Sequence, residues 1–86
     1  MPEISRFFGV VIRMFWDDHN PPHFHAFYGD DEALIAITSV SLFAGHLTPR
    51  TLGLVVEWAT LHQQELLDDW YRAKAQQALK SIEPLR

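Results

Sequence analysis

Three of the five histidines lie within seven consecutive positions, at His19, His23 and His25. Neutral imidazole is the commonest protein ligand for zinc and related ions. If His23 and His25 lie on a strand, their side chains point to the same side, with Cα atoms about 6.5–7 Å apart. The two prolines before His23 force the chain to turn, which keeps His19 close to that pair. The spacing therefore predicts a divalent-metal site on the three histidines.

Other side chains are placed to complete or line such a site. On a helix, His62 and Glu65 are three residues apart and share one narrow stripe. We expect one of them to supply a further ligand if the helix packs over the strand with the histidines. The walls of the cleft are expected to come from Trp16, Asp18 and Tyr28. Two other roles for the histidines stay open: structural packing against aromatic rings, and acid–base catalysis beside an aspartate.

The composition excludes several classes of function. The absence of cysteine excludes disulfides and thiolate metal sites, and it is typical of a cytoplasmic protein. The four glycines form no phosphate-binding loop, and no serine lies in the setting of a catalytic nucleophile. The seven basic residues are scattered in a chain of net charge −4, which argues against non-specific binding to nucleic acid. These residues name no reaction, and a divalent metal is the one cofactor they indicate.

The N-terminal region also argues against a membrane location. Its longest apolar run, from Phe7 to Ile12, is far too short to cross a bilayer. The first residues lack the basic and apolar segments of a secretory signal. We therefore expect a cytoplasmic protein with no membrane partner.

The histidine turn needs strands to hold it, and the 86-residue chain has the size of one domain, residues 1–86. Alternating apolar residues and short turns predict strands at about 6–16, 23–28, 32–38 and 41–45. Thr48 followed by Pro49 is a helix-start signal, and the helical pattern extends to about residue 79. These elements predict an α+β fold: an antiparallel meander of three or four strands packed against one long C-terminal helix.

The predicted helix is apolar on more than one side. The stripe through Val55 and Leu66 suits the sheet, but Leu54, Trp58 and Leu61 lie around from it. An apolar strip that the fold does not cover marks an interface. We therefore expect a homodimer with these three residues at or near the contact.

One continuous run and several separate positions match a known family. The run is Asp18-His19-Asn20-Pro21-Pro22-His23-Phe24-His25, with Tyr28 after it. Further matches are Ile4–Phe7, Gly45, Leu47, Glu57–Ala59, His62, Glu65–Leu66, Trp70 and Ile82–Leu85. In these residues the chain resembles the bacterial family called domain of unknown function 4160. The resemblance implies a cytoplasmic protein without an established activity, whose gene often lies beside another small gene, as in toxin–antitoxin or regulatory pairs.

Two functions are therefore weighed. The first is an interaction or regulatory module of such a gene pair, which binds a copy of itself or a protein encoded nearby. The second is a metal-binding or metal-dependent hydrolytic domain that uses His19, His23 and His25. The lack of a positioned nucleophile favours the first.

Overall fold

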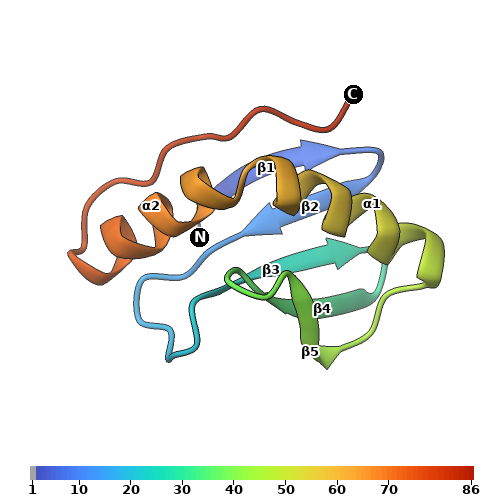
Figure 1. Ribbon diagram of the computed structural model, residues 1–86, viewed down its shortest axis with the longest axis horizontal. Coiled ribbons are helices and arrows are strands. Elements are labelled where there is room, and N and C mark those ends of the chain that lie inside the picture. The colour runs from blue at the N-terminus through green and yellow to red at the C-terminus, as the bar shows by residue number, and fades with distance from the viewer. Residues whose placement is uncertain (1) are drawn as a thin grey trace.

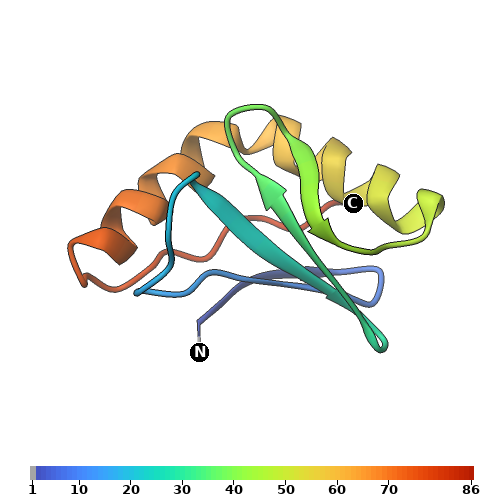
Figure 2. The same ribbon diagram turned by 90° about the horizontal axis from the view of Figure 1, so that it is seen from below.

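The computed structural model describes residues 2–86, which form a five-stranded antiparallel sheet with two helices on one face (Figures 1 and 2). The strands are β1 (Glu3–Phe7), β2 (Val10–Arg13), β3 (His23–Tyr28), β4 (Asp31–Ala36) and β5 (Ser41–Gly45), each beside its neighbour in the sequence. The helices are α1 (Pro49–Leu61) and α2 (Gln63–Lys74). The α+β class and the antiparallel meander are confirmed, whereas the predicted three or four strands and single helix are wrong in number.

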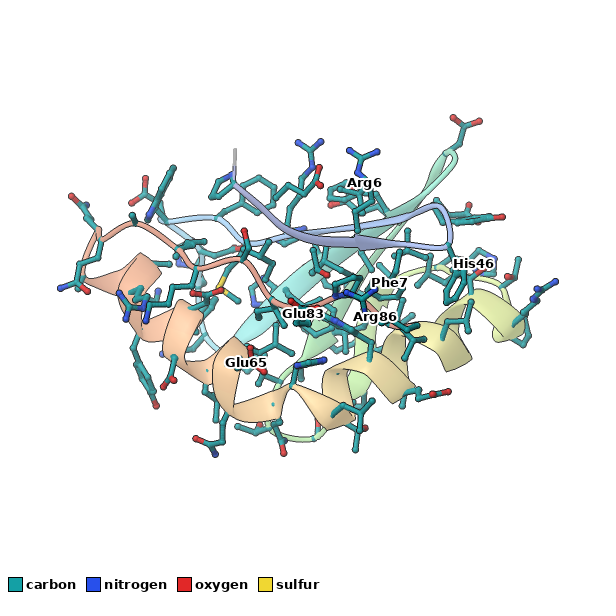
Figure 3. All side chains as sticks on the ribbon, turned by 90° about the horizontal axis from the view of Figure 1, so that it is seen from above. Arg6, Phe7, His46, Glu65, Glu83 and Arg86 are labelled. Atoms are coloured by element: carbon teal, nitrogen blue, oxygen red, sulfur yellow. The ribbon has the colours of Figure 1, made fainter. Side chains whose placement is uncertain are left out.

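The strand predicted over residues 6–16 is a hairpin of two strands. Phe8 and Gly9 both have positive φ angles, 47° and 82°, and Phe7 pairs with Val10 across the turn. Positive φ at both central residues defines the type I′ turn that matches the twist of a hairpin. On β1 itself, Phe7 points toward the helices and Arg6 points away from them (Figure 3). The apolar alternation continues through the turn, so it hid the break from the sequence pattern.

The helix predicted over residues 49–79 is interrupted at His62, whose backbone has φ −120° and ψ 26°. The next residue, Gln63, donates hydrogen bonds from its side-chain nitrogen to the carbonyls of Ile37 (2.8 Å) and Thr38 (3.1 Å). These bonds fix the start of α2 to the end of β4. The sequence has no glycine or proline at this point that would have predicted the break in the helix. Neither of the two helices described is long and apolar enough to cross a membrane.

Residues 75–86, which we call the C-terminal strap, run back past the helices and β1 (Figure 1). The strap leaves α2 through Gln76, whose φ is 57°. The backbone N–H of Ile82 donates to the carbonyl of Ile4 at 2.8 Å, and the Ile82 side chain is buried. The strap thus completes the core at the β1 edge of the sheet.

Trp58 belongs to this core and not to an interface, which corrects the sequence prediction. Its ring is fully buried, with centroids 5.3 Å from Phe7 and 5.7 Å from Phe24. Its indole N–H donates to the carbonyl of Glu83 in the strap at 2.8 Å. The prediction failed because the sequence did not show that the tail returns to cover this side of α1. Of the other two predicted contact residues, Leu54 is half-buried and Leu61 is 67% exposed.

Asp69 of α2 is buried and holds the strap. Its Oδ1 accepts the backbone N–H of Lys80 at 2.8 Å, but its Oδ2 has no hydrogen-bond partner within residues 2–86. Burial raises the pKa of Asp69, and the Lys80 hydrogen bond offsets only part of that rise. The folded protein therefore binds this proton more tightly than the unfolded chain does.

Two glycine substitutions should change stability in opposite directions. At Gly45 φ is 79°, and an added Cβ would lie 2.1 Å from the backbone oxygen of Glu32, so Gly45→Ala should destabilise the fold by about 2 kcal/mol or more. At Gly53, inside α1, an added Cβ meets nothing within 4 Å, so Gly53→Ala should stabilise it by about 0.5–1 kcal/mol. Urea denaturation measures the unfolding free energy of both variants and of the wild type. Equal effects of the same sign would contradict this account of Gly45.

The buried Asp69 should give stability a specific pH dependence. A carboxyl with a raised folded-state pKa stabilises the fold fully below its unfolded value of 3.8, and this contribution is lost as pH rises through the raised pKa. Asp69→Asn keeps an oxygen for Lys80 but cannot titrate. The unfolding free energy of the variant minus that of the wild type should therefore increase with pH above 3.8 and then level off. Parallel pH profiles of the two proteins would show that Asp69 does not titrate in this way.

Candidate metal site

The site lies where the loop between β2 and β3, residues 14–22, meets the start of β3. This loop projects past the ends of its strands (Figure 1), and its Asn20–Pro21 peptide bond is cis. His23 and His25 alternate along β3 with Phe24, whose side chain is fully buried in the core. Because strand residues two apart point to the same side, the two imidazoles share one face at the mouth of the loop.

Three side chains converge there: Asp18, His23 and His25. Their donor atoms all lie within 4.8 Å of one another. Asp18 Oδ2 is 3.0 Å from His23 Nε2 and 2.9 Å from His25 Nε2. The His25 contact has hydrogen-bond geometry, whereas the His23 nitrogen is buried without any hydrogen-bond partner within residues 2–86.

The other nitrogen of each ring already has an acceptor. His23 Nδ1 lies 2.8 Å from the carbonyl oxygen of Pro21, and His25 Nδ1 lies 2.9 Å from Glu32 Oε2. A carbonyl can only accept, so His23 Nδ1 carries the proton and donates it. His25 lies between two carboxylates at 2.9 Å, so its proton can lie on Nδ1, toward Glu32, or on Nε2, toward Asp18. With both rings neutral and protonated on Nδ1, both Nε2 atoms carry lone pairs, and both lie about 3 Å from Asp18 Oδ2.

This arrangement needs a positive charge at its centre. Two lone pairs and a carboxylate oxygen at about 3 Å repel one another unless a proton or a metal ion lies among them. Protonation makes His25 an imidazolium between two carboxylates. A proton on His23 Nε2 would stabilise the contact with Asp18 less, because the two atoms are not aligned for a hydrogen bond. His23 Nε2 is therefore buried without a hydrogen-bond partner within residues 2–86, and its lone pair is available to a metal ion.

Aromatic rings hold the two imidazoles in place. The ring of Phe15 meets His25 edge-on at 4.4 Å between centroids. His23 packs between Phe43 of β5 and Trp70 of α2, each at 5.3 Å. The exposed fraction of the side chain rises from 4% at His23 to 12% at His25 and 23% at Asp18. The donor set is therefore rigid at its base and opens to solvent on the Asp18 side.

The end of α2 and the strap position the loop. Lys74 donates from Nζ to the backbone oxygen of Asp18, and its ammonium lies 4.8 Å from the centre of the Trp70 ring. The indole N–H of Trp16 donates to the carbonyl of Gln77 at 3.1 Å. These contacts join the loop to residues more than fifty positions later in the chain, so the donor set depends on the whole fold.

The electrostatics favour an ionised Asp18. Its partial burial acts to raise the pKa, but the hydrogen bond from His25 and the positive charge available on both imidazoles outweigh that effect. The backbone N–H of His19, 3.3 Å from Oδ1, acts in the same direction. The pKa of Asp18 is therefore below its ordinary value, and the carboxylate is available as an anionic ligand at neutral pH.

The structure brings together two of the three predicted histidine ligands. His23 and His25 converge as expected, but the ring of His19 is exposed and lies outside the donor set. Asp18, expected to line the cleft, takes the third donor position because its carboxylate turns in toward the rings. Trp16 borders a hollow of about 370 Å³ beside Asp18, together with Phe15 and Asp17.

Three other predicted residues lie outside the site. Tyr28 is at the opposite end of β3 and borders a separate hollow with Phe8 and Thr48. His62 and Glu65 form their own pair at 2.6 Å and are not among the converging donors. The predicted meeting of the helical pair with the histidines does not occur, because Trp70 and Lys74, five and nine residues beyond Glu65, face the site instead.

Sequence reasoning missed Glu32 and the α2 residues. Glu32 is seven positions from His25 and reaches it only because Phe27 pairs with Glu32 across the β3–β4 hairpin, which sets its carboxylate diagonally beside His25. The short turn at Gly29 carried that signal, since it fixes the register. No sequence signal could have placed Trp70 or Lys74 here.

The comparison with protein families can now be added to this geometry. The model of the family described as domain of unknown function (DUF4160) matches residues 9–71. The chain belongs to this family. The matched segment contains Asp18, His23, His25 and Glu32, and it ends before the strap begins. Comparison with curated proteins and with solved structures returned no match.

The Nδ1 contact of His23 leads to a spectroscopic prediction. In the metal-free protein at alkaline pH, where the ring is neutral, the carbonyl of Pro21 should hold the proton on Nδ1. Long-range ¹H–¹⁵N NMR distinguishes this tautomer from the Nε2–H form that free histidine prefers. Exposed His46, beside the start of α1 (Figure 3), is the internal control and should show the ordinary tautomer mixture. An Nε2–H form at His23 would contradict the ligand geometry.

Proposed function

We propose that this protein binds a divalent transition-metal ion, with zinc as its reference ion, through Asp18 Oδ2, His23 Nε2 and His25 Nε2. One observation carries the proposal: the Nδ1 atoms of both histidines already have acceptors, and both Nε2 atoms lie within 3.0 Å of one carboxylate oxygen. Histidine ligands of metals nearly always donate their second ring N–H to a carboxylate or a backbone carbonyl. Glu32 and Pro21 are placed to do this.

The distances support a site that closes slightly when no ion is bound. Zinc bonds to nitrogen and oxygen are about 2.0–2.2 Å, which separates tetrahedral ligand atoms by about 3.3 Å. The Oδ2–Nε2 distances of 3.0 and 2.9 Å are a few tenths of an ångström shorter. Admitting the ion needs a small outward movement of the Asp18 carboxylate, the most exposed of the three side chains, and, because the donor atoms span up to 4.8 Å, a shift of the imidazole rings toward the ion.

The ligand chemistry selects the class of metal. One carboxylate and two imidazoles suit zinc, iron, nickel or copper better than calcium or magnesium, which prefer oxygen. Three protein ligands leave a position for water or another donor, as in catalytic zinc sites. The hydrolytic alternative considered from the sequence would use a water at that position.

An interaction or regulatory module of a gene pair is the second candidate. It is favoured by Leu61, whose side chain is 67% exposed on α1, and by Tyr71, which is 64% exposed on α2. A homodimer or a protein encoded nearby would bury such residues. With Trp58 in the core, the predicted interface has lost its anchor, so we place this candidate second.

Zinc affinity should depend strongly on the donor residues and less strongly on Glu32, which orients one of them. Protein purified without a histidine tag and freed of metal should take up one zinc ion per chain in calorimetry. Asp18→Asn, which keeps the shape but removes the anionic ligand, should abolish this uptake. Glu32→Gln should weaken it by about 10–100-fold, because Glu32 orients His25. Affinity should also fall as pH is lowered, since protons compete for the imidazoles.

Glu65→Gln is the matched control, because it also removes a carboxylate that contacts a histidine, at 2.6 Å, but outside the donor set. Its zinc affinity should equal that of the wild type. Circular dichroism establishes that each variant is folded. Failure of the wild type to bind zinc, nickel or iron(II), or equal binding by Asp18→Asn, would refute the proposed function.

A further inference from the structure

We infer that the metal ion joins two copies of the chain, with His19 of a second copy as its fourth ligand. The inference rests on the proposed function and goes beyond it by naming the partner. It starts from the donor set, which has three members, whereas zinc bound by nitrogen and oxygen takes four ligands. The fourth position lies on the open side of the site, because the base is closed by Trp70 and Phe43.

The open side has room for an incoming side chain. The hollow there, of about 370 Å³, is bordered by Phe15, Trp16, Asp17 and Asp18. An imidazole is much smaller than this hollow, so the ring of another chain can lie in it beside Asp18. Trp16, 41% exposed and held by its bond to Gln77, offers a fixed aromatic wall for that ring.

His19 is the donor that the loop presents outward. Its ring is exposed, and within residues 2–86 it takes part in no hydrogen bond or ion pair. Its backbone N–H is bonded to Oδ1 of the same Asp18 that supplies Oδ2 to the donor set, which holds His19 beside the site. An exposed ring that is adjacent in sequence to one ligand, but outside the donor set, is suited to a neighbouring molecule.

Two-fold symmetry makes the exchange reciprocal. In a two-fold dimer the same patch on each chain forms the contact, so a histidine given by one copy is matched by one received. The projecting β2–β3 loop carries Asp18 and His19, and the other two donors follow at the start of β3, so that one contact can serve both functions (Figure 1). Two metal ions would then lie across the dimer axis from each other.

The charges make this association depend on the metal. Each loop carries the carboxylates of Asp17 and Asp18, and each chain has a net charge of −4, so two bare loops repel each other. Two divalent ions supply four positive charges against those four carboxylates. Trp16 and Phe43, which is 46% exposed, add apolar area near the site that association removes from water.

Sedimentation of the untagged full chain with and without zinc tests the inference. In excess chelator we expect a monomer of 10.0 kDa, and with one equivalent of zinc per chain we expect the mass to double. His19→Ala should bind zinc but remain monomeric. His46→Ala, which removes another exposed histidine from a different loop, should dimerise like the wild type.

A mixing experiment separates a ligand from a second copy from one within the same chain. His19→Ala keeps the donor set but lacks the bridging ring, and Asp18→Asn keeps the ring but lacks the donor set. Neither variant alone should dimerise with zinc. An equal mixture should form a heterodimer with one zinc ion, because the second variant supplies His19 to the intact site of the first.

The possible results have distinct meanings. Zinc bound to a wild-type monomer overturns the inference and leaves the proposed function standing. No zinc bound at all refutes the proposed function. A zinc-dependent dimer that survives His19→Ala, a dimer that persists in chelator, or a mixture that stays monomeric also overturns the inference.

Discussion

The contact between the Asp18 carboxylate and two imidazole nitrogens is the constraint around which the site is arranged. Each ring nitrogen that could have relieved it by turning is already bonded, one to Pro21 and the other to Glu32. The rings cannot rotate without giving up those bonds and their aromatic neighbours. The positions of the donors therefore favour a positive charge at the centre, and His23 Nε2 has no hydrogen-bond partner of its own within residues 2–86.

The fold supplies this rigidity from three directions. The hairpin register of β3 and β4 places Glu32 beside His25. On β5, Phe43 lies at the register shift between the paired residues Leu42 and Ala44, and its ring meets His23. From the other layer, α2 contributes Trp70 and Lys74, one against a ring and the other against the loop backbone. The strap then holds α2 and the loop through Asp69 and Trp16. Asp18, a candidate ligand on a projecting loop, is in this way supported by packing throughout a small domain.

The sequence predicted those features that depend on local order. Residues two apart in a strand share a face, and so the convergence of His23 and His25 could be predicted; Thr48 and Pro49 gave the start of α1. What failed depends on contacts distant in sequence. The bond from Gln63 to Ile37 divides the helix, the return of the strap buries Trp58, and the turn of the Asp18 side chain excludes His19. The hairpin at Phe8 was missed for a different reason. Phe8 is a type of residue that rarely adopts a positive φ, and the apolar alternation on either side of it resembles that of one continuous strand.

The geometry also connects the two functions that the sequence left side by side. A tetrahedral ion with three protein ligands has one exchangeable position, and that position is filled either by water or by an imidazole. With water it has the composition of a hydrolytic centre; with His19 of a second copy it has a closed shell and becomes a structural cross-link. The same ion therefore cannot serve both functions at once, and the association of two chains would switch off any chemistry that requires bound water. Because the bridge needs two chains and a metal, the fraction of bridged dimer rises with the concentration of the chain and with that of the metal. A metal-dependent module of this kind reports metal availability through its own assembly, which is a regulatory property that needs no nucleophile.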